Sequence, residues 1–168
     1  SRSQRRVLNR NSHVEVTVTS PCVTDEHVAL FNAYHRDMTA RREWPDNPTS
    51  FQNYYESFIG GQYPFAREFQ YRKGGDLIGV GLVDVMNQGL SSVYFYHDPA
   101  WRRLAPGTFS ILTEINWGLS SSLRYSYLGY WIHENQSMDY KARFKPHELL
   151  DECVDTNESP SWRSAPDA

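Results

Sequence analysis

The chain has 168 residues, a formal net charge of −3 and 39% hydrophobic residues, so it is long enough for one domain with its own core. Its two cysteines, Cys22 and Cys153, lie 131 positions apart without metal-ligand spacing, which predicts a reducing compartment and no metal site. No apolar run reaches the roughly 18 residues that a membrane span requires. These features predict a cytoplasmic protein without a membrane partner.

Charge changes along the chain. Residues 1–10 contain four arginines and no acid, whereas residues 151–168 contain five acids and one arginine. Over the whole chain, positive and negative charges nearly cancel, so the net charge does not attract the protein to nucleic acid. Contact with a polyanion therefore requires a local basic patch. We expect residues 1–12 to be a basic arm or the tail of a preceding domain, residues 13–150 to form the folded domain, and residues 151–168 to be a disordered acidic tail.

The first third of the chain predicts one strand and two helices. Alternating valines predict a strand over residues 13–19. Apolar residues at helical spacing predict a helix over residues 25–42, with Thr24 available as its N-cap. A second aromatic stripe follows Asn47, a typical N-cap residue, and ends at the glycine pair 60–61.

Three strands are expected next, as an antiparallel meander. Each ends at a turn signal, and their ranges are residues 65–73, 76–86 and 90–97. A helix over residues 108–121, a strand over 124–132 and a helical or irregular stretch over 138–150 complete the pattern. This order resembles that of the GCN5-related acetyltransferase (GNAT) architecture. It implies an α/β (α+β) fold in which helices flank a mainly antiparallel mixed central sheet.

The loop after the third meander strand resembles the GNAT segment in which N–H groups at a helix start bind a pyrophosphate. The residues that stand in this place are Arg102, Arg103, Gly107 and Thr108. We expect them to bind the phosphates of an acyl donor, although Pro106 removes one backbone donor from the loop. The alternative is an ordinary solvated loop whose arginines serve solubility.

Four sequence blocks carry a more specific resemblance. They are "SRSQRR" (1–6), "REFQYRKGGDLIGVGLVDVMNQGLSSVYFYHDP" (67–99), "YSYLGYWI" (125–132) and "MDYKARFKPHELL" (138–150). Together they resemble the C-terminal domain of the aminoacyl-tRNA protein transferases, which include arginyltransferases and bacterial aspartate/glutamate leucyltransferases. Family members usually carry a preceding domain with a cysteine cluster, and a cysteine where Asn135 stands.

The resemblance implies an enzyme that takes its acyl group from aminoacyl-tRNA instead of coenzyme A and needs no cofactor. The acceptor is the amino terminus of a protein that begins with Asp or Glu, and the added residue marks that protein for degradation in the N-degron pathway. The last two blocks are closer to the leucyl branch, so leucine is preferred and arginine stays open. Two alternatives remain, an acyl-CoA-dependent GNAT acyltransferase and a non-catalytic module that binds acidic amino termini.

The implied reaction is aminolysis of an ester, which needs positioning, oxyanion donors and a route for one proton. We expect the catalytic residues to be Glu68, Asp84, Tyr94 and Tyr96. Asp84 is the least natural core residue of its apolar strand, so Asp84 or Glu68 would hold the incoming ammonium or accept its proton. A tyrosine hydroxyl would protonate the leaving ribose oxygen. Alternatively, the tyrosines only pack the core and Asp84 caps a turn.

Selection of an acidic acceptor requires a fixed cation, because the acceptor carboxylate must be paired when it is buried. The acceptor-binding candidates are Arg67, Tyr140, Lys141 and Arg143, and the cations among them could equally form structural salt bridges. Arg5 and Arg6 could contact the tRNA acceptor stem or belong to a solvated arm.

A leucyl donor requires an apolar pocket for its side chain. The candidates for its lining are Leu128, Tyr130, Trp131 and Met138, each of which could instead be an ordinary core residue. An arginyl donor would require a buried acid such as Glu114 or Glu134.

Overall fold

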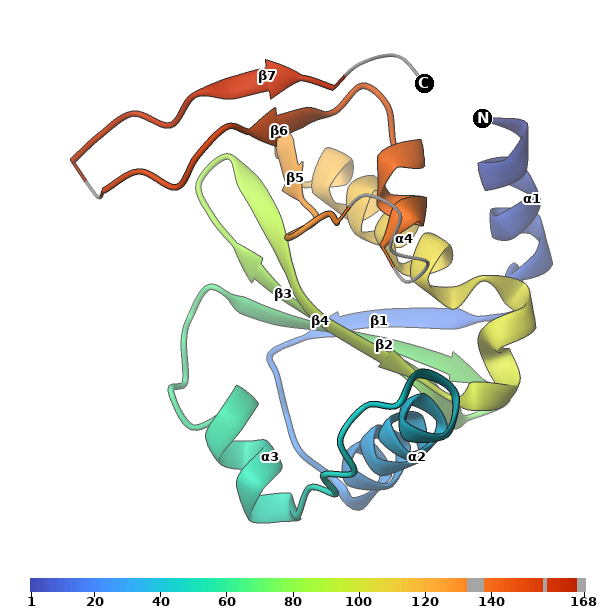
Figure 1. Ribbon diagram of the computed structural model, residues 1–168. Coiled ribbons are helices and arrows are strands. Elements are labelled where there is room, and N and C mark those ends of the chain that lie inside the picture. Colours follow the sequence, from blue (N-terminus) through green and yellow to red (C-terminus); the bar gives the residue numbers. More distant parts are fainter. Residues whose placement is uncertain (133–137, 156, 166–168) are drawn as a thin grey trace. The chain divides into compact units, whose positions relative to one another are not determined.

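The structure of the protein is a computed structural model that describes residues 1–132, 138–155 and 157–165. The chain forms two compact units, Ser1–Gly129 and Tyr130–Ala168. The first contains α1 (Arg2–Arg10), β1 (Glu15–Thr19), α2 (Asp25–Arg42), α3 (Phe51–Phe58), β2 (Ala66–Lys73), β3 (Asp76–Val85), β4 (Gly89–His97), the 3₁₀ helix η1 (Pro99–Leu104), α4 (Pro106–Ser120) and β5 (Tyr125–Tyr127) (Figure 1). The second contains the 3₁₀ helix η2 (Asp139–Arg143), β6 (Glu148–Leu150) and β7 (Trp162–Ser164).

The first unit is built on a mixed sheet. Its strands follow the order β1-β2-β3-β4-β5 in the described part of the chain. Neighbours from β1 to β4 are antiparallel, and β5 runs parallel to β4. The predicted mainly antiparallel sheet, with its three-strand meander, is therefore confirmed. Among the described residues, no helix has both the length and the apolar composition needed to cross a bilayer.

The helix starts follow local chemistry. Thr24 caps α2 as predicted, because its hydroxyl accepts a hydrogen bond from the backbone N–H of His27. Helix α3 begins later than predicted, since Ser50 and not Asn47 is its N-cap. Helix α4 begins earlier, with Pro106 as its first residue, where the missing proline N–H removes no helical hydrogen bond.

The C-terminal part differs from the sequence-based expectation. The strand predicted over residues 124–132 ends at Tyr127, because Gly129 has a φ of 71°, which interrupts extended backbone. The stretch over residues 138–150, predicted as helical or irregular, contains the short η2 and then β6. Strand β7 pairs antiparallel with β6 within a stretch where the sequence predicted a disordered tail.

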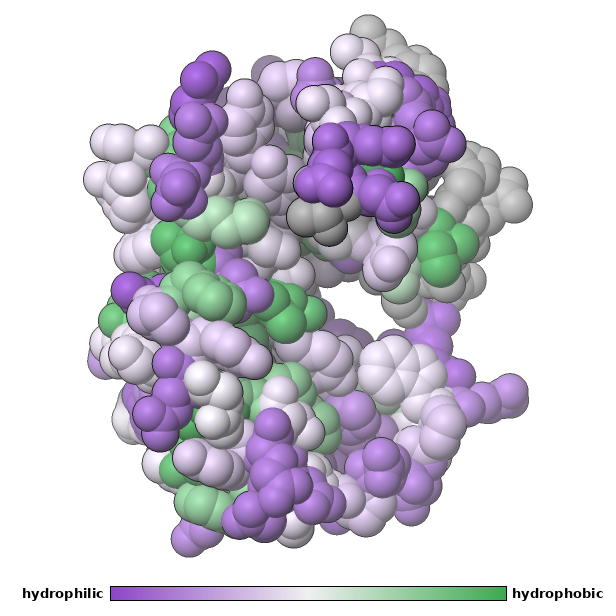
Figure 2. Space-filling model, turned by 90° about the vertical axis from the view of Figure 1, so that its left-hand side faces the viewer, coloured by the Kyte–Doolittle hydropathy of each residue, from purple (hydrophilic) through white to green (hydrophobic). Residues whose placement is uncertain are grey.

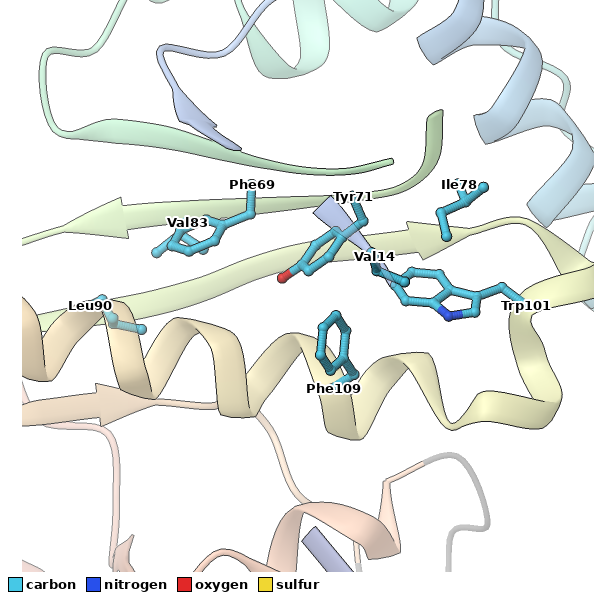
Figure 3. Close-up of a cluster of buried hydrophobic side chains, with 8 residues drawn as sticks. All are labelled: Val14, Phe69, Tyr71, Ile78, Val83, Leu90, Trp101 and Phe109. Atoms are coloured by element: carbon cyan, nitrogen blue, oxygen red, sulfur yellow. The ribbon is translucent and has the colours of Figure 1, made fainter. Parts of the chain in front are cut away.

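One hydrophobic core lies between the sheet and α4 (Figure 3). In that view, Phe109 of α4 points toward Tyr71 of β2, and Trp101 of η1 closes the same layer. The Tyr71 ring lies 5.9 Å from that of Phe109 and 5.6 Å from that of Trp101, measured between ring centroids. This packing fixes η1 and the first turns of α4 against the sheet.

A second core lies on the opposite face of the sheet, under α2 and α3. It contains Phe31 of α2, Tyr54 of α3 and Tyr96 of β4 among its buried residues. Tyr94 packs against this cluster from β4, so Tyr94 and Tyr96 share one face, as the alternation of strand side chains predicts.

Helix α1 lies within the residues expected as a basic arm or the tail of a preceding domain. Ser1 and Gln4 build a capping box at its start, and Val7 and Leu8 pack against the first core. Asn11, fully buried after the helix, donates through its amide to the backbone oxygens of Val7 and Leu104, at 2.9 Å each. Its side-chain oxygen accepts from the Trp101 indole at 2.8 Å. The end of α1 is thereby tied to η1.

Candidate functional site

The start of α4 presents unsatisfied backbone donors. Its N-cap is Ala105, with a φ of 57°, and no side chain of the described residues caps this end. Gly107 and Thr108 lie in the first turn, where helix N–H groups have no partner within the helix. The structure therefore brings two of the predicted phosphate-binding residues to a helix start that favours an anion.

The two arginines of η1 differ in their surroundings. Arg102 forms an ion pair with the carboxylate of Asp37 on α2. Partial burial acts to raise the pKa of Asp37, but hydrogen bonds from Arg102 and Arg41 hold it below its usual value. Arg103 is exposed, and its backbone oxygen accepts a hydrogen bond from the guanidinium of Arg10 at 3.1 Å. Arg103 and Arg10 are thus exposed neighbours beside the α4 start.

Strand β4 contains a β-bulge, and only part of its edge is paired with β5. The register to β3 shifts so that Leu82 faces Tyr94 and Val83 faces Ser92, which leaves Val93 without a partner in the ladder among the described residues. The β5 ladder covers only Gly89–Ser91 in the described part. Bulges are common next to active sites because they redirect the chain and interrupt pairing.

Tyr94 has a partner that the sequence did not reveal. Its hydroxyl lies 2.9 Å from Nε2 of His35 on α2. Burial raises the pKa of Tyr94 and lowers the pKa of His35, so the pair consists of a protonated phenol and a neutral imidazole near neutral pH. The sequence predicted the helix over residues 25–42 that carries His35, but no local signal pointed to its contact with Tyr94.

Asp84 is a half-buried carboxylate on the face that carries Tyr94. It lies two residues after Leu82, which belongs to the core beneath α2 and α3, and it is paired in register with Ala66. No other described residue hydrogen-bonds or ion-pairs with its carboxylate. Desolvation raises the pKa of Asp84, as expected for an unpaired acid.

Glu68 is fully buried, and both of its carboxylate oxygens have polar partners. Its Oε1 lies 3.0 Å from His27 Nε2 and accepts from Gln70 Nε2 at 2.7 Å, and its Oε2 accepts from the backbone N–H of Cys22 at 3.3 Å. The sequence alone did not indicate Cys22 and His27 as partners of Glu68. Cys22 and His27 are only five positions apart, which could have suggested that their side chains lie close together. Glu68, however, comes from β2, 41 positions after His27.

Tyr96 is also fully buried. Its hydroxyl lies 2.6 Å from the hydroxyl of Tyr54, and burial raises the pKa values of both phenols. The two catalytic tyrosine candidates therefore have different environments, because only Tyr94 is half-exposed.

Arg67 lines a pocket of about 240 Å³ between the β1–α2 connection and the end of α3. Its guanidinium donates to the backbone oxygens of Pro64 and Ala66, at 2.8 and 2.7 Å, and makes no ion pair with the described residues. Ala66 also lines this pocket, and its register partner on β3 is Asp84. Among the described residues, the pocket lining includes the Arg67 cation but not Asp84.

A second pocket, of about 510 Å³, lies between α2, α3 and their connection. His35, Trp44 and Phe58 are among its lining residues, and Phe58 lines both pockets. The α3 side of the first unit faces the viewer in Figure 2, where apolar side chains occur in small groups among hydrophilic ones. His35, whose Nε2 lies 2.9 Å from the Tyr94 hydroxyl, is thus exposed to this pocket on its other side.

The remaining predicted residues lie near or within the second unit. Tyr140, Lys141 and Arg143 belong to η2, where the Lys141 ammonium donates to the Tyr130 backbone oxygen at 2.8 Å and burial lowers the pKa of Lys141. For the predicted aminoacyl pocket, Leu128 and Trp131 are half-buried, as is Met138, whereas Tyr130 is 83% exposed. None of these four lines either pocket described above.

Of the acids named for an arginyl donor, Glu114 lies buried between α4 and the sheet. It accepts hydrogen bonds from Ser92 and Ser110, and desolvation raises its pKa. Glu134 and Asn135 lie outside the described residues.

Comparison with solved structures shows the fold. The chain is similar to the ribosomal-protein-S18-alanine N-acetyltransferase from Escherichia coli, with a TM-score of 0.56 and 14% identity, covering 88% of this chain and 90% of that chain. It is also similar to an aminoglycoside acetyltransferase from an uncultured soil metagenomic sample in complex with sisomicin, with a TM-score of 0.57 and 12% identity, covering 88% and 99%. The predicted GNAT-like fold is confirmed.

Comparison with sequences is more specific. Curated relatives named aspartate/glutamate leucyltransferase include one from Helicobacter hepaticus, 36% identical over 96% of this chain and 67% of its own length. Others come from Campylobacter jejuni and Saccharophagus degradans, each 37% identical over 89% of this chain and 63% of its own length. The chain thus spans about two thirds or less of the relatives it matches. The family model described as "Arginine-tRNA-protein transferase, C terminus" matches residues 26–151, and the chain belongs to this family.

Proposed function

We propose that this chain is the acyl-transfer part of an aminoacyl-tRNA protein transferase. It would move leucine from charged tRNA to the amino terminus of proteins that begin with Asp or Glu, which marks them for degradation. The observation that carries this proposal is the 36–37% identity to proteins named aspartate/glutamate leucyltransferase over 89–96% of this chain.

The donor side of the proposal rests on the start of α4. The 3′ end of a charged tRNA carries phosphates close to the reactive ester, and the N–H groups of Gly107 and Thr108 at the uncapped helix start would bind such an anion. Exposed Arg103 adds positive charge beside them, while Arg102 is already paired with Asp37 and would serve mainly to fix the loop. The open edge of β4 after Ser91 would receive the ester next to this site.

The proton of the attacking amine would go to Asp84. The amine must be neutral to attack the ester carbonyl, and one proton must leave the nitrogen as the new amide bond forms. Asp84 suits this role because its carboxylate has no partner among the described residues and its pKa is raised. Glu68 suits it less, because it is fully buried and hydrogen-bonded to His27 and Gln70.

The leaving ribose oxygen needs a proton in return. The hydroxyl of Tyr94 would supply it, and His35 at 2.9 Å would orient that hydroxyl. Tyr96 would support the site indirectly, because its hydroxyl is occupied by Tyr54 inside the core. The proton taken by Asp84 and the proton given by Tyr94 balance over one turnover.

Acceptor selection would use Arg67. A guanidinium whose described partners are only backbone oxygens can still pair with the carboxylate of an Asp or Glu side chain. Asp84, the register partner of the pocket residue Ala66, would then meet the α-amine of that acceptor residue. Tyr140, Lys141 and Arg143 of the second unit are further contacts that we propose for the acceptor.

We propose that Leu128, Tyr130, Trp131 and Met138 contact the side chain of the donor amino acid. Because this set is apolar, it would favour leucine over arginine. We also propose that the complete protein contains a further region preceding this chain, as its relatives are longer. A cytoplasmic location is part of the proposal, supported by two cysteines that are free in the structure.

The test is a donor and acceptor screen on the complete protein. tRNA is charged with leucine, with arginine or with other amino acids, and the mass of peptides that begin with Asp, Glu or Ala is followed. We expect transfer of leucine to the Asp and Glu peptides only. Arginine transfer would move the protein to the arginyl branch, and acyl transfer from acyl-CoA would replace the proposal. Peptide binding without any turnover would identify a recognition module.

A further inference from the structure

Three side chains of different chemistry converge near the start of α2. Cys22 comes from the β1–α2 connection, His27 from the first turn of α2 and Glu68 from β2. The Cys22 sulfur lies 3.9 Å from His27 Nε2 and 3.6 Å from Glu68 Oε1, and these two atoms lie 3.0 Å apart. Each residue thus directs one potential metal-ligand atom to a common point.

We propose that Cys22, His27 and Glu68 form a binding site for a divalent transition metal ion of the zinc type. Bond lengths of about 2.3 Å to sulfur and about 2.0 Å to nitrogen and oxygen place tetrahedral ligands about 3.5 Å apart when one is sulfur and about 3.3 Å apart when neither is. The three separations match this geometry to within about 0.4 Å. A sulfur, an imidazole and a carboxylate are also a ligand set that suits zinc.

The surrounding residues orient the ligands. The Thr24 hydroxyl lies 2.7 Å from His27 Nδ1, which fixes the ring so that Nε2 points to the other two ligand atoms. The Gln70 amide donates to Glu68 Oε1 at 2.7 Å and to the Cys22 sulfur at 3.6 Å. Such outer contacts are typical of metal sites, because they hold ligands in place before the ion binds.

Burial favours a bound cation. Glu68 is fully buried and His27 is 1% exposed, and a buried carboxylate gains from a compensating positive charge. Cys22 is only half-buried, so the site is open on its side. Three protein ligands would leave the fourth tetrahedral position to water.

The three ligands differ from the residues to which we assign the aminoacyl-transfer steps, Asp84, Tyr94 and Arg67. The metal site would link the β1–α2 connection to β2 beside Tyr54, whose ring lies 6.2 Å from that of His27 between centroids. Pro21 and Arg67, the chain neighbours of Cys22 and Glu68, line the smaller pocket. The existence of the metal site does not depend on the identity of the donor or the acceptor. The proposal therefore stands or falls independently of the transferase reaction.

The test uses the 168-residue chain, in which Cys22 and Cys153 are the only cysteines. The chelated protein is titrated with zinc against a competing chromophoric chelator and, in parallel, with Co²⁺, whose thiolate ligation gives a charge-transfer absorption. We expect one equivalent of metal per chain, a cobalt–thiolate band, and a higher midpoint of thermal unfolding with zinc.

Variants assign the ligands. Cys22→Ser should abolish the cobalt–thiolate band and weaken zinc binding at least tenfold, and His27→Gln should weaken it similarly, whereas Cys153→Ser should change neither. Circular dichroism checks that each variant folds, and the half-buried Cys22→Ser variant keeps the test decisive if His27→Gln does not fold. The proposal is overturned if the wild-type chain binds less than one equivalent, or if Cys22→Ser binds zinc as tightly as the wild type.

Discussion

The hydroxyl of Tyr94 and Nε2 of His35 lie 2.9 Å apart, although the two residues are 59 positions apart in the chain. The contact joins the middle of β4 to α2 at the edge of the larger pocket. The contact fixes the direction of the Tyr94 hydroxyl, while the Tyr94 ring packs in an aromatic cluster.

The first prediction concerns this hydroxyl. Tyr94→Phe keeps the ring and removes the proposed proton donor, so we expect kcat to fall by about 10²-fold with little change in KM for charged tRNA. Single-turnover transfer of labelled leucine measures the step. Tyr34→Phe is the matched control, since Tyr34 also contacts the ring of His35, at 5.6 Å between centroids, and should retain near wild-type activity. Equal losses in both variants would contradict the assignment.

Asp84→Asn separates catalysis from stability. Burial raises the pKa of Asp84 above its unfolded value, so its protonated form favours folding and this contribution is lost as the pH rises through the folded pKa. At pH 7 the uncharged amide should therefore leave Tm unchanged or raise it, while kcat falls by about 10²-fold or more.

The pH profile provides the check on Asp84. Wild-type kcat/KM should fall at acidic pH as Asp84 becomes protonated, with a midpoint above the ordinary aspartate value, and Asp84→Asn should lose this limb. A variant that is destabilised and equally active would show that Asp84 is a structural residue.

Arg103→Ala tests the donor site. The side chain is exposed beside the uncapped start of α4, so its removal should weaken binding of charged tRNA and reduce the slope of log K against log salt by about 1. Lys73→Ala, an exposed cation at the β2–β3 turn, is the control and should leave both quantities unchanged. Filter binding over a salt series measures them.

Asn11→Ala should destabilise the first unit. The change removes contacts to Val7, Leu104 and Trp101 and leaves the buried indole N–H without its partner, for a loss of about 1–3 kcal/mol. Urea unfolding gives the value, and Asn9→Ala, at an exposed position of α1, is the control. The result would count against the proposed support of η1 if both variants unfold at the same urea concentration.

Gly79→Ala and Gly81→Ala form a matched pair on β3. A Cβ at Gly79 would lie 2.6 Å from the buried Trp101 ring, so overpacking should lower stability by about 1–3 kcal/mol. At Gly81 the nearest atom, of the Glu114 carboxylate, is 3.5 Å away, an ordinary contact. Thermal unfolding of the two variants should therefore differ, and similar Tm values would contradict the described packing of η1.

The sequence predicted the elements that carry local signals. The meander of β2, β3 and β4 was predicted because its turns are marked by Gly-Gly, Asn-Gln-Gly and Asp-Pro. The cap of α2 was predicted because Thr24, an N-cap residue type, stands just before the helical pattern. The shared face of Tyr94 and Tyr96 followed from strand alternation alone. In each case, neighbours within a few positions determine the outcome.

Long-range polar partners carry no such signal. Asn11 fell within the range expected as a basic arm or the tail of a preceding domain, because its partners Trp101 and Leu104 lie about ninety positions away. The same holds for the distant contacts of His35 with Tyr94 and of His27 with Glu68. A single left-handed glycine, Gly129, was enough to end a strand that composition alone would have extended.

Asn11 connects the end of α1 to the segment that leads into α4. Its amide donates to the backbone oxygen of Leu104, and the guanidinium of Arg10 donates to the neighbouring backbone oxygen of Arg103. A truncation that deletes α1 and Asn11 would therefore remove both of these hydrogen bonds from the residues that precede Gly107.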